Sequence, residues 1–336
     1  MTYRAAVFTK DKTCEIVQKQ SQPLKHGQAR VKTTCCGVCH TDLHVRDQEF
    51  GNSVGRVGGH EGVGIVTEIS PDVKSLKVGD RVSIAWLFSA CGACEQCIAG
   101  REAMCSNQTN PGLSADGAFA EEVVVAADYA VKVPEGLDDG AASSVTCAGV
   151  TVYKAIKEAH IIPGQVIALW GLGGLGSLAV QIAKSYNCKI IALDVNDRQL
   201  EFAKANGADH VINSRDGVAA AKEIQDKFGG AHACVITATA VPAFEAALNS
   251  VRPFGRVVAV GLPSKLMQLS IPNLVLKGIQ LVGSIVGTRN DLAEAFQLAK
   301  AGFINPTTAP RKLEDIDEIM EEMQKGTITG RMVVYF

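Results

Sequence analysis

Apolar and polar positions divide the chain into two parts with different patterns. Up to about residue 145, short apolar or alternating runs are separated by turns that contain glycine, proline and aspartate, such as Ser70-Pro71-Asp72. This pattern is typical of a mainly β domain. The clearest predicted strands are Arg4–Thr9, Arg30–Cys35, Val63–Ile69, Arg81–Leu87 and Glu122–Val125.

After Thr146 the pattern changes to strands that alternate with helices. Six short runs rich in valine and isoleucine are predicted strands: Gln165–Trp170, Lys189–Asp194, His210–Asn213, Ala233–Ala238, Arg256–Val260 and Gln280–Ile285. The helix-like stretches between them include Gly174–Tyr186, Arg198–Asn206, Val218–Phe228 and Ala243–Val251. This alternation predicts an α/β fold, a doubly wound parallel sheet with helices on both faces.

The end of the chain offers two further helices, Asp291–Ala301 and Glu314–Gln324, and a last strand, Arg331–Tyr335. These elements are too few for a third core. We therefore expect residues 1–147 to form one domain that residues 288–336 complete, and residues 148–287 to form the α/β domain.

Length and charge limit the classes of function. A chain of 336 residues with 47% hydrophobic and 20% charged residues has the composition of a globular protein with two domains. The net charge of −2 and the absence of a Lys/Arg block argue against a nucleic-acid or membrane partner. The uncharged run Ile161–Ala183 contains Pro163 and five glycines, which disfavours a membrane span.

No secretory signal precedes the first strand, so we expect a cytoplasmic protein. Thiols stay reduced in that compartment, and clustered cysteines there indicate metal sites more often than disulfides.

A glycine-rich loop follows the first α/β strand. The strand Gln165–Trp170 leads into GLGGLG at residues 171–176, which opens a helix. In this G-x-G-x-x-G pattern the first glycine permits the tight turn, the second lets the backbone approach a pyrophosphate, and the last allows close helix–strand packing. The predicted cofactor-binding residues of this loop are Gly171, Gly173, Gly174 and Gly176.

An acid at the end of the next strand strengthens this interpretation. Asp194 lies 23 residues after Gly171, the spacing at which a carboxylate accepts hydrogen bonds from the adenosine ribose. Val195 and Asn196 follow, so no cation stands directly beside the acid to receive a 2′-phosphate, and NAD is favoured over NADP. Arg198, four residues further on, leaves some NADP use open.

Four cysteines in one segment predict a closed metal site. Cys91, Cys94, Cys97 and Cys105 can supply four thiolates to a tetrahedral zinc ion, which leaves no position for a substrate. The predicted role is therefore structural, and the alternative is a redox or disulfide cluster.

A second group of metal-binding residue types is spread over three segments. Cys39, His40, Thr41, Asp42 and His44 lie close together, Gly59-His60-Glu61 follows, and Cys147 comes later. Sulfur and nitrogen ligands from separate segments suit a catalytic zinc with an open fourth position. Spacing alone does not choose Cys39 over Cys35 or Cys36, nor His60 over His40.

These segments resemble the zinc-containing alcohol dehydrogenases of the medium-chain dehydrogenase/reductase superfamily. The resemblance rests on residues 37–44 (GVCHTDLH), Gly59-His60-Glu61, the four-cysteine segment and residues 147–154 (CAGVTVYK), and it extends in order to Gly330-Arg331. The chain is most similar to the compact bacterial and yeast type. The resemblance implies a GroES-like catalytic domain beside a Rossmann domain.

The resemblance also implies roles for individual residues. Cys39, His60 and Cys147 are implied as ligands of a catalytic zinc ion, so that each subunit holds two zinc ions, one catalytic and one structural. Asp42 would orient His60, and Glu61 would lie close behind the metal. The remaining implied residues are Thr41 and His44 for a proton relay, His40 and Arg331 near the cofactor pyrophosphate, and Phe50 and Trp86 in the substrate pocket.

The implied reaction is the reversible oxidation of short primary alcohols such as ethanol to aldehydes. It proceeds through a zinc-bound alkoxide, hydride transfer to NAD, and proton loss through Thr41, the cofactor ribose and His44. The partners expected are a small alcohol or aldehyde and further copies of the chain, as a homotetramer. The alternatives are a relative that acts on formaldehyde adducts, polyols or aromatic alcohols, and a catalytically silent, zinc-stabilised binding or redox-sensing protein.

Overall fold

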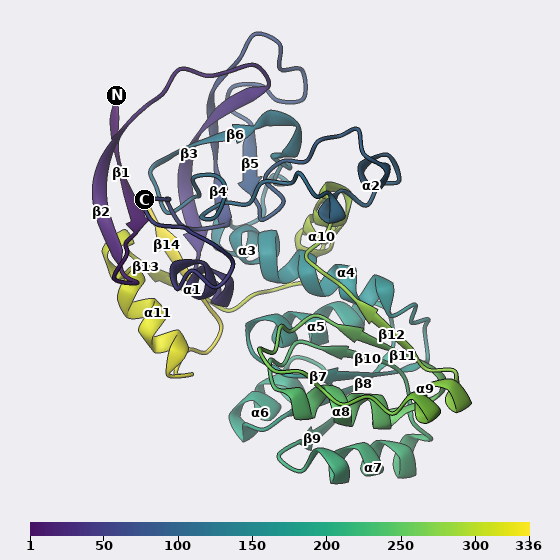
Figure 1. The fold of residues 1–336 in the computed structure, drawn as a ribbon. Coiled ribbons are helices and arrows are strands. Elements are labelled where there is room, and N and C mark those ends of the chain that lie inside the picture. Colours follow the sequence, from purple (N-terminus) through teal and green to yellow (C-terminus); the bar gives the residue numbers. More distant parts are fainter. The chain divides into compact units, whose positions relative to one another are not determined.

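The computed structural model describes residues 1–336 and divides them into two units. Unit 1 contains Met1–Val150, Val286–Ala301 and Pro306–Phe336, and unit 2 contains Thr151–Ile285 and Gly302–Asn305. Figure 1 shows both units, and each is described here by itself.

Unit 1 is mainly β. Its larger sheet has the order β13-β14-β3-β4-β5, and β6 also pairs with β3. The strands are β3 (Gln28–Gly37), β4 (Glu61–Ile69), β5 (Arg81–Ile84), β6 (Glu122–Ala126), β13 (Thr308–Arg311) and β14 (Arg331–Tyr335). A separate antiparallel pair consists of β1 (Thr2–Phe8) and β2 (Cys14–Gln20). The antiparallel pair β3–β4 forms the centre, because small and β-branched side chains along both strands are buried in one core.

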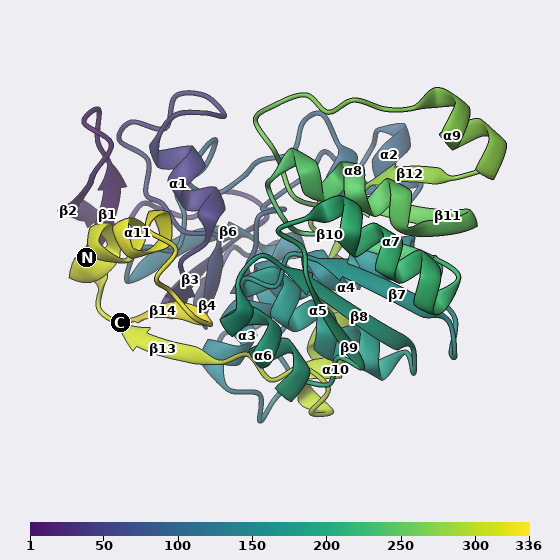
Figure 2. The ribbon, with the colours of Figure 1, turned by 90° about the horizontal axis from the view of Figure 1, so that it is seen from below.

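Helix α11 (Ile316–Gln324) packs against the core of unit 1. It buries Ile316, Ile319, Met320 and Met323, which recur at helical spacing. It lies beside the β1–β2 pair in Figure 2, where the backbone N–H of Cys14 donates to Asp317 at 3.0 Å. The other helices of unit 1 are α1 (His40–Arg46), α2 (Glu95–Ile98), α3 (Asp139–Ser144) and α10 (Arg289–Lys300).

Unit 2 is a parallel sheet with the order β12-β11-β10-β7-β8-β9. Its strands are β7 (Val166–Trp170), β8 (Lys189–Asp194), β9 (His210–Asn213), β10 (Ala231–Ile236), β11 (Val251–Ala259) and β12 (Gln280–Gly283). Its helices are α4 (Val150–Glu158, whose first residue belongs to unit 1), α5 (Gly174–Ser185), α6 (Asp197–Ala205), α7 (Gly217–Phe228), α8 (Val241–Ser250) and α9 (Ile271–Lys277).

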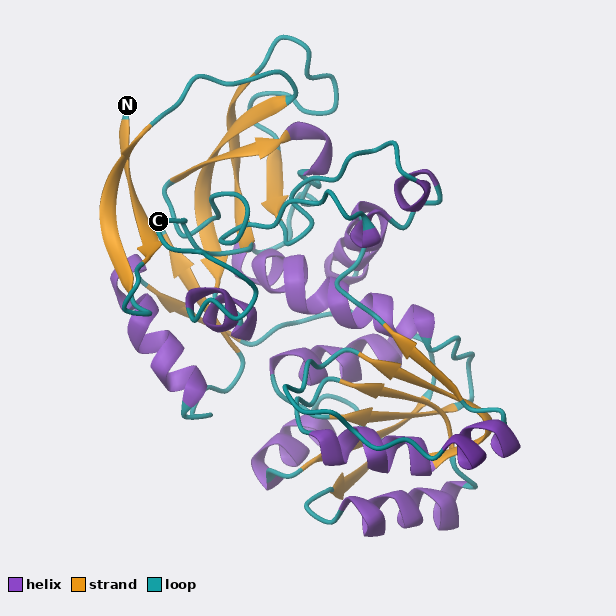
Figure 3. Ribbon diagram, viewed as in Figure 1, coloured by secondary structure: helices purple, strands orange, loops and turns teal.

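The helices of unit 2 cover both faces of its sheet, as Figure 3 shows. The helices α5 and α6 pack on β7, β8 and β9, whereas α7 and α8 pack together and on β10. Every side chain of β7 is buried, as expected for a central parallel strand between two helical layers. The predicted fold class, a Rossmann-type sheet with a mainly β second domain, is confirmed.

Some elements were not predicted from the apolar pattern. The strands β2 and β13 have no fully buried side chain, and the helices α1 and α3, with seven and six residues, are too short to show a helical period. The segment Gly302–Asn305 returns to unit 2, where the N–H of Asn305 donates to the Gln181 side chain at 2.7 Å. The first unit boundary lies at Val150 and the second at Ile285.

Candidate functional site

Three segments of unit 1 bring a group of metal-binding side chains together. Cys39 lies between β3 and α1, His60 and Glu61 lie at the start of β4, and Cys147 lies on a π-helical turn, Val145–Gly149. Their four donor atoms lie within 4.8 Å of one another, and all four residues are buried. Single π-helical turns are rare and occur mostly at functional sites. The structure thus selects Cys39 and His60 from the candidates that spacing left open.

Asp42 holds two members of this group. One carboxylate oxygen accepts the backbone N–H of Cys39 at 2.9 Å, and the other lies 2.9 Å from Nδ1 of His60. Burial opposes protonation of His60, but the charges and hydrogen bonds of Asp42 and Cys39 together outweigh it and raise the pKa of His60 well above its usual value. With Nδ1 hydrogen-bonded to a carboxylate, Nε2 of His60 becomes the metal-binding nitrogen.

The residues fit a divalent metal ion. Nε2 of His60 is buried and has no hydrogen-bond partner, which is costly unless an electron-pair acceptor lies beside it. Hydrogen bonding from Cys147 lowers the pKa of Cys39 well below its usual value, so one thiol is already disposed to ionise. Two sulfurs and one imidazole are the donor set of a catalytic zinc with one open position.

Glu61 and Arg331 form a buried ion pair beside the cluster. Nη2 of Arg331 donates to Oε1 of Glu61, while Oε2 of Glu61 and Nε of Arg331 have no partner. Burial raises the pKa of Glu61 to about 7, although Arg331 opposes this rise. Glu61 therefore lies close behind the candidate metal position. The pair itself was not anticipated, because its members are 270 residues apart in sequence. The expected contact of Arg331 with a pyrophosphate remains a prediction.

The four cysteines of the segment 91–105 form a second cluster. Their sulfur atoms are 3.5 Å apart for Cys94 and Cys97, 3.6 Å for Cys91 and Cys105, and 4.0 Å for Cys91 and Cys97. A tetrahedral site with Zn–S bonds of about 2.3 Å requires sulfur separations of about 3.8 Å. Backbone N–H groups of Ala93 and Cys94 lower the pKa of Cys91 to about 6, which favours its thiolate. The cluster therefore fits a zinc ion with four sulfur ligands.

An ion pair attaches this segment to the rest of unit 1. Nε and Nη2 of Arg289, at the start of α10, donate to the two carboxylate oxygens of Glu102 at 2.8 and 2.7 Å. The Arg289 guanidinium also lies 4.3 Å from the ring centroid of Tyr129. Glu102 stands between Cys97 and Cys105 and was not recognised from sequence, because nothing local distinguishes it from a surface acid.

The predicted relay residues share one face of α1. Thr41 and His44 are three positions apart, and side chains with this spacing are neighbours on a helix. Nδ1 of His44 lies 2.8 Å from a carboxylate oxygen of Glu49, and the His44 ring contacts Phe50 at a centroid distance of 5.6 Å. His40, at the start of α1, is exposed. Phe50 is 43% exposed, so its predicted pocket role remains a prediction.

Trp86 lies directly against the metal-binding group. Its ring meets the His60 ring edge to face, with centroids 5.2 Å apart. Trp86 also lines a small cavity together with Thr146, Val150 and Leu292, all of them in unit 1. Trp86 is therefore in position to limit the space beside the candidate metal.

The glycine loop of unit 2 has the geometry that a dinucleotide requires. Gly171 has a φ of +93°, and a Cβ there would lie 2.6 Å from the backbone nitrogen of Ala238. A Cβ on Gly176 would collide with the carbonyl oxygen of Gly171, whereas Gly173 faces open space. The open side at Gly173 lies at the start of α5, which begins at Gly174, and helix N-termini favour phosphate. The loop fits the pyrophosphate of a dinucleotide.

Asp194 is at the end of β8 beside this loop. One of its carboxylate oxygens accepts the N–H of Leu172 at 2.7 Å, and the other accepts the N–H of Asn196 at 2.9 Å. The acid predicted to bind ribose therefore also fixes the glycine loop. Arg198 is exposed in the first turn of α6.

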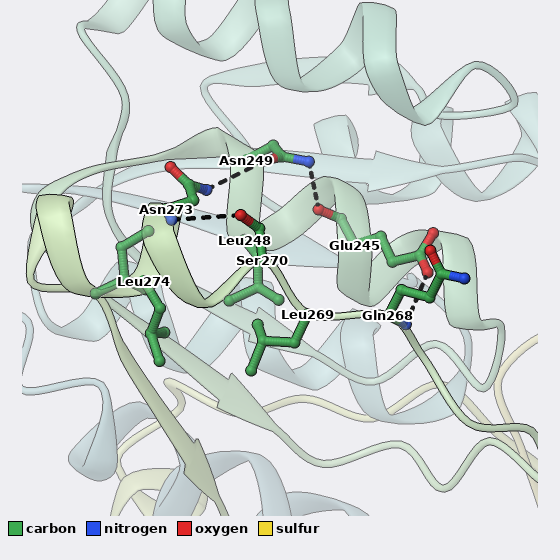
Figure 4. A pocket seen from close by; sticks show the side chains of 9 residues that line it. Glu245, Leu248, Asn249, Gln268, Leu269, Ser270, Asn273 and Leu274 are labelled. Carbon is green, nitrogen blue, oxygen red and sulfur yellow. Dashed lines mark hydrogen bonds between the residues drawn. The ribbon is translucent and has the colours of Figure 1, made fainter.

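A separate pocket of unit 2 contains none of the predicted residues. It has a volume of about 390 Å³ and lies between α8 and the segment 268–274 (Figure 4). Its polar groups are already bonded to one another: Gln268 N–H donates to Glu245 at 3.3 Å, and Asn273 Nδ2 donates to Asn249 at 3.4 Å. We therefore do not assign the predicted chemistry to this pocket.

None of the helices is both long and apolar enough to cross a membrane.

Two family models match the chain. Residues 25–135 match the alcohol dehydrogenase GroES-like domain, and residues 174–301 match the zinc-binding dehydrogenase.

Solved structures with the same fold include three named enzymes. Acetophenone reductase from Geotrichum candidum, in complex with NAD, is 30% identical, with a TM-score of 0.89 over 100% of this chain and 97% of that chain. An alcohol dehydrogenase from Aeropyrum pernix is 29% identical, with a TM-score of 0.90 over 99% and 100%. Benzyl alcohol dehydrogenase from Acinetobacter calcoaceticus is 28% identical, with a TM-score of 0.91 over 100% and 99%.

Proposed function

The chain belongs to the zinc-containing alcohol dehydrogenases of the medium-chain dehydrogenase/reductase superfamily, and from this premise we propose that it is a zinc-dependent, NAD-linked enzyme that oxidises short primary alcohols reversibly to aldehydes. The observation that carries the proposal is the buried set Cys39, His60 and Cys147, with Asp42 behind His60. A catalytically silent protein that is only stabilised by zinc would not need Thr41 and His44 together with this ligand set.

In the proposed reaction, a zinc ion held by Cys39, His60 and Cys147 would lower the pKa of an alcohol hydroxyl and polarise an aldehyde carbonyl. Asp42 keeps Nε2 of His60 turned toward the metal position. Trp86 excludes water from one side. Thr41 accepts the hydroxyl proton at its side-chain oxygen as it gives up its own proton, and His44 is the final acceptor of the relay, at Nε2, because its Nδ1 is hydrogen-bonded to Glu49.

The proposed cofactor is NAD, which accepts the hydride. Asp194 favours an unphosphorylated ribose. The glycine loop at residues 171–176 leaves open space at Gly173 for the pyrophosphate. The relative from Geotrichum candidum was solved with NAD, which agrees with this choice. The second zinc ion is assigned to the four cysteines of the segment 91–105.

An alcohol panel with NAD, followed by NADH absorbance and combined with metal analysis, tests this function. We expect turnover of ethanol and propanol and two zinc ions per chain. A purified chain that holds zinc only in the four-cysteine segment and turns over no alcohol would be the silent binding protein instead. Turnover confined to benzyl-type alcohols would contradict the short-chain assignment, and the Acinetobacter calcoaceticus relative gives a specific reason to include such alcohols.

Two variants test individual roles. Replacement of His44 by Gln should slow oxidation and change its pH profile while zinc content stays the same.

Trp86→Ala should shift preference toward longer alcohols, because it enlarges the space beside His60. Unchanged relative kcat/KM values across a chain-length series would contradict the second role.

We also propose a cytoplasmic homo-oligomer, with pairing between copies through β12. This strand is at the edge of its sheet, and unpaired edges are stabilised by a partner strand. Exposed apolar side chains directly precede it in the sequence, on α9, where Val275 is 68% and Leu276 is 85% exposed. Pairing of two β12 strands accounts for a dimer, and a tetramer remains the expectation from the resemblance. Leu276→Lys should lower the mass of the oligomer measured by analytical ultracentrifugation. If the unsubstituted chain is itself a monomer in this measurement, the proposal is wrong.

A further inference from the structure

Arg215 lies beside the ribose-binding acid although it comes from another element. It follows β9, whose last residue, Asn213, pairs with Asp194 at the end of β8. The N–H of Ser214 donates to the Asp194 carbonyl at 2.9 Å, and Nε of Arg215 donates to the Val195 carbonyl at 2.9 Å. These bonds hold the end of β9 beside the end of β8 and place Nε of Arg215 at the backbone carbonyl of the residue that follows Asp194.

Most of the hydrogen-bonding capacity of Arg215 remains available. Its Nε makes the bond to Val195, and its contact with Asp197 is a long one, 3.8 Å between Nη2 and a carboxylate oxygen. Both side chains of that contact are more than two-thirds exposed, and such a pair adds little stability. A guanidinium has five N–H donors in a rigid fork that matches phosphate oxygens.

The charge around the acid is balanced. Asp194 and Asp197 contribute two negative charges, and Arg198 and Arg215 contribute two positive ones. Both oxygens of Asp194 already accept a backbone N–H, from Leu172 and Asn196, which reduces the negative potential that a second anion would meet. A carboxylate has further lone pairs, so Asp194 still accepts a ribose hydroxyl.

We propose that Arg215 is a cofactor-selectivity residue, which binds the 2′-phosphate of NADP and gives this chain a second, weaker cofactor beside NAD. The inference rests on the proposed dinucleotide site, and it adds a residue that neither the glycine loop nor Asp194 supplies. Arg198 assists from α6. Arg215 contributes more, because its bond to Val195 holds the fork in place before binding, whereas the Arg198 side chain on the first turn of α6 makes no such bond.

Nucleotide fragments test the proposal without metal or alcohol. Isothermal titration of the full-length protein with 5′-AMP and with 2′,5′-ADP measures the ribose site alone. We expect both to bind, and Arg215→Ala to weaken 2′,5′-ADP about tenfold more than 5′-AMP. Arg198→Ala should have a smaller effect in the same direction. Lys204→Ala removes one exposed positive charge from the same helix as Arg198 and should leave both affinities unchanged.

The outcomes separate this proposal from the dehydrogenase assignment. Equal weakening of both fragments by Arg215→Ala would show that Arg215 contacts the adenosine or maintains the fold, and would overturn the selectivity role. Binding of 5′-AMP without detectable 2′,5′-ADP binding would also overturn it, while leaving NAD as the cofactor. Failure of both fragments to bind would contradict the dinucleotide site itself.

Discussion

The two cysteine-containing clusters of unit 1 are built in opposite ways. The cluster Cys91–Cys105 comes from one segment, and its ligands range from exposed to buried. The other cluster takes Cys39, His60 and Cys147 from three separate segments and is buried throughout. The first brings its ligands together over a short loop, which costs little chain entropy, whereas the second needs β3, β4 and the π-helical turn in place beforehand. A closed local site suits a structural ion, and a site assembled by the fold suits an ion that must act on a substrate.

The largest expected effect is on the buried cluster. Cys147→Ser should lower kcat/KM by roughly a thousandfold or more, because the Lewis acid would lose a thiolate ligand. Metal analysis should show the loss of one zinc ion per chain, with the ion of Cys91–Cys105 retained. Cys188→Ser, at a half-buried cysteine of unit 2 outside both clusters, is the control. Retention of both ions in Cys147→Ser would place the third ligand elsewhere.

Cys97→Ser should have the reverse pattern. Loss of the ion from the cluster Cys91–Cys105 should lower Tm by roughly 5 °C or more, since structural zinc contributes folding free energy. Activity per folded molecule should fall only a few-fold. Differential scanning calorimetry and active-site titration measure the two quantities. An activity loss as large as that of Cys147→Ser, without a change in Tm, would remove the distinction between the clusters.

Asp42→Asn keeps the ligands and changes only what orients them. Removing the charge beside Nδ1 of His60 should weaken metal binding at the buried cluster about 10- to 100-fold. Competition with a chelator measures this affinity, and the ion at Cys91–Cys105 serves as an internal reference. Asp47→Asn, at the other end of α1, is the matched control. Equal zinc release from both clusters would show that Asp42 does not act through His60.

The smallest expected effect concerns the ion pair between Glu102 and Arg289, which attaches the segment of Cys91–Cys105 to the rest of unit 1. Burial opposes ionisation of Glu102, but hydrogen bonds and charge from Arg289 outweigh it and lower the pKa of Glu102 below its usual value. The stability from this pair is therefore present above the pKa of an unfolded glutamate, about 4.3, and is lost as the pH falls through the lower folded value.

Glu102→Gln should cost roughly 1–2 kcal/mol at pH 7, and less at pH 3, in urea unfolding. Glu95→Gln removes an acid from the same segment that is 86% exposed and should change stability little at either pH. A cost for Glu102→Gln that is the same at both pH values would contradict the role of its charge.

The same contrast explains what the sequence could predict. The glycine loop, Asp194 and the four cysteines each lie within one short segment or at a fixed spacing, so local pattern was sufficient for them. The choice of Cys39 and His60 depended on the resemblance, because only the fold brings these residues to Cys147.

Partners at long sequence separation were not predictable. The pairs Glu61–Arg331 and Glu102–Arg289 join residues 270 and 187 positions apart, and nothing in the local sequence around either glutamate indicates the distant arginine that pairs with it. The bond from Arg215 to Val195 depends on the parallel pairing of β8 with β9, a register that apolar runs do not specify.

The short return of Gly302–Asn305 to unit 2 limits how this protein can be divided. The Gln181 side chain, only 9% exposed, accepts from the N–H of Asn305 and donates to its carbonyl. A recombinant fragment cut at residues 151–285 would leave that amide without either bond. Chimeras that exchange the nucleotide-binding part between relatives should therefore carry four residues from near the C-terminus together with the main insert.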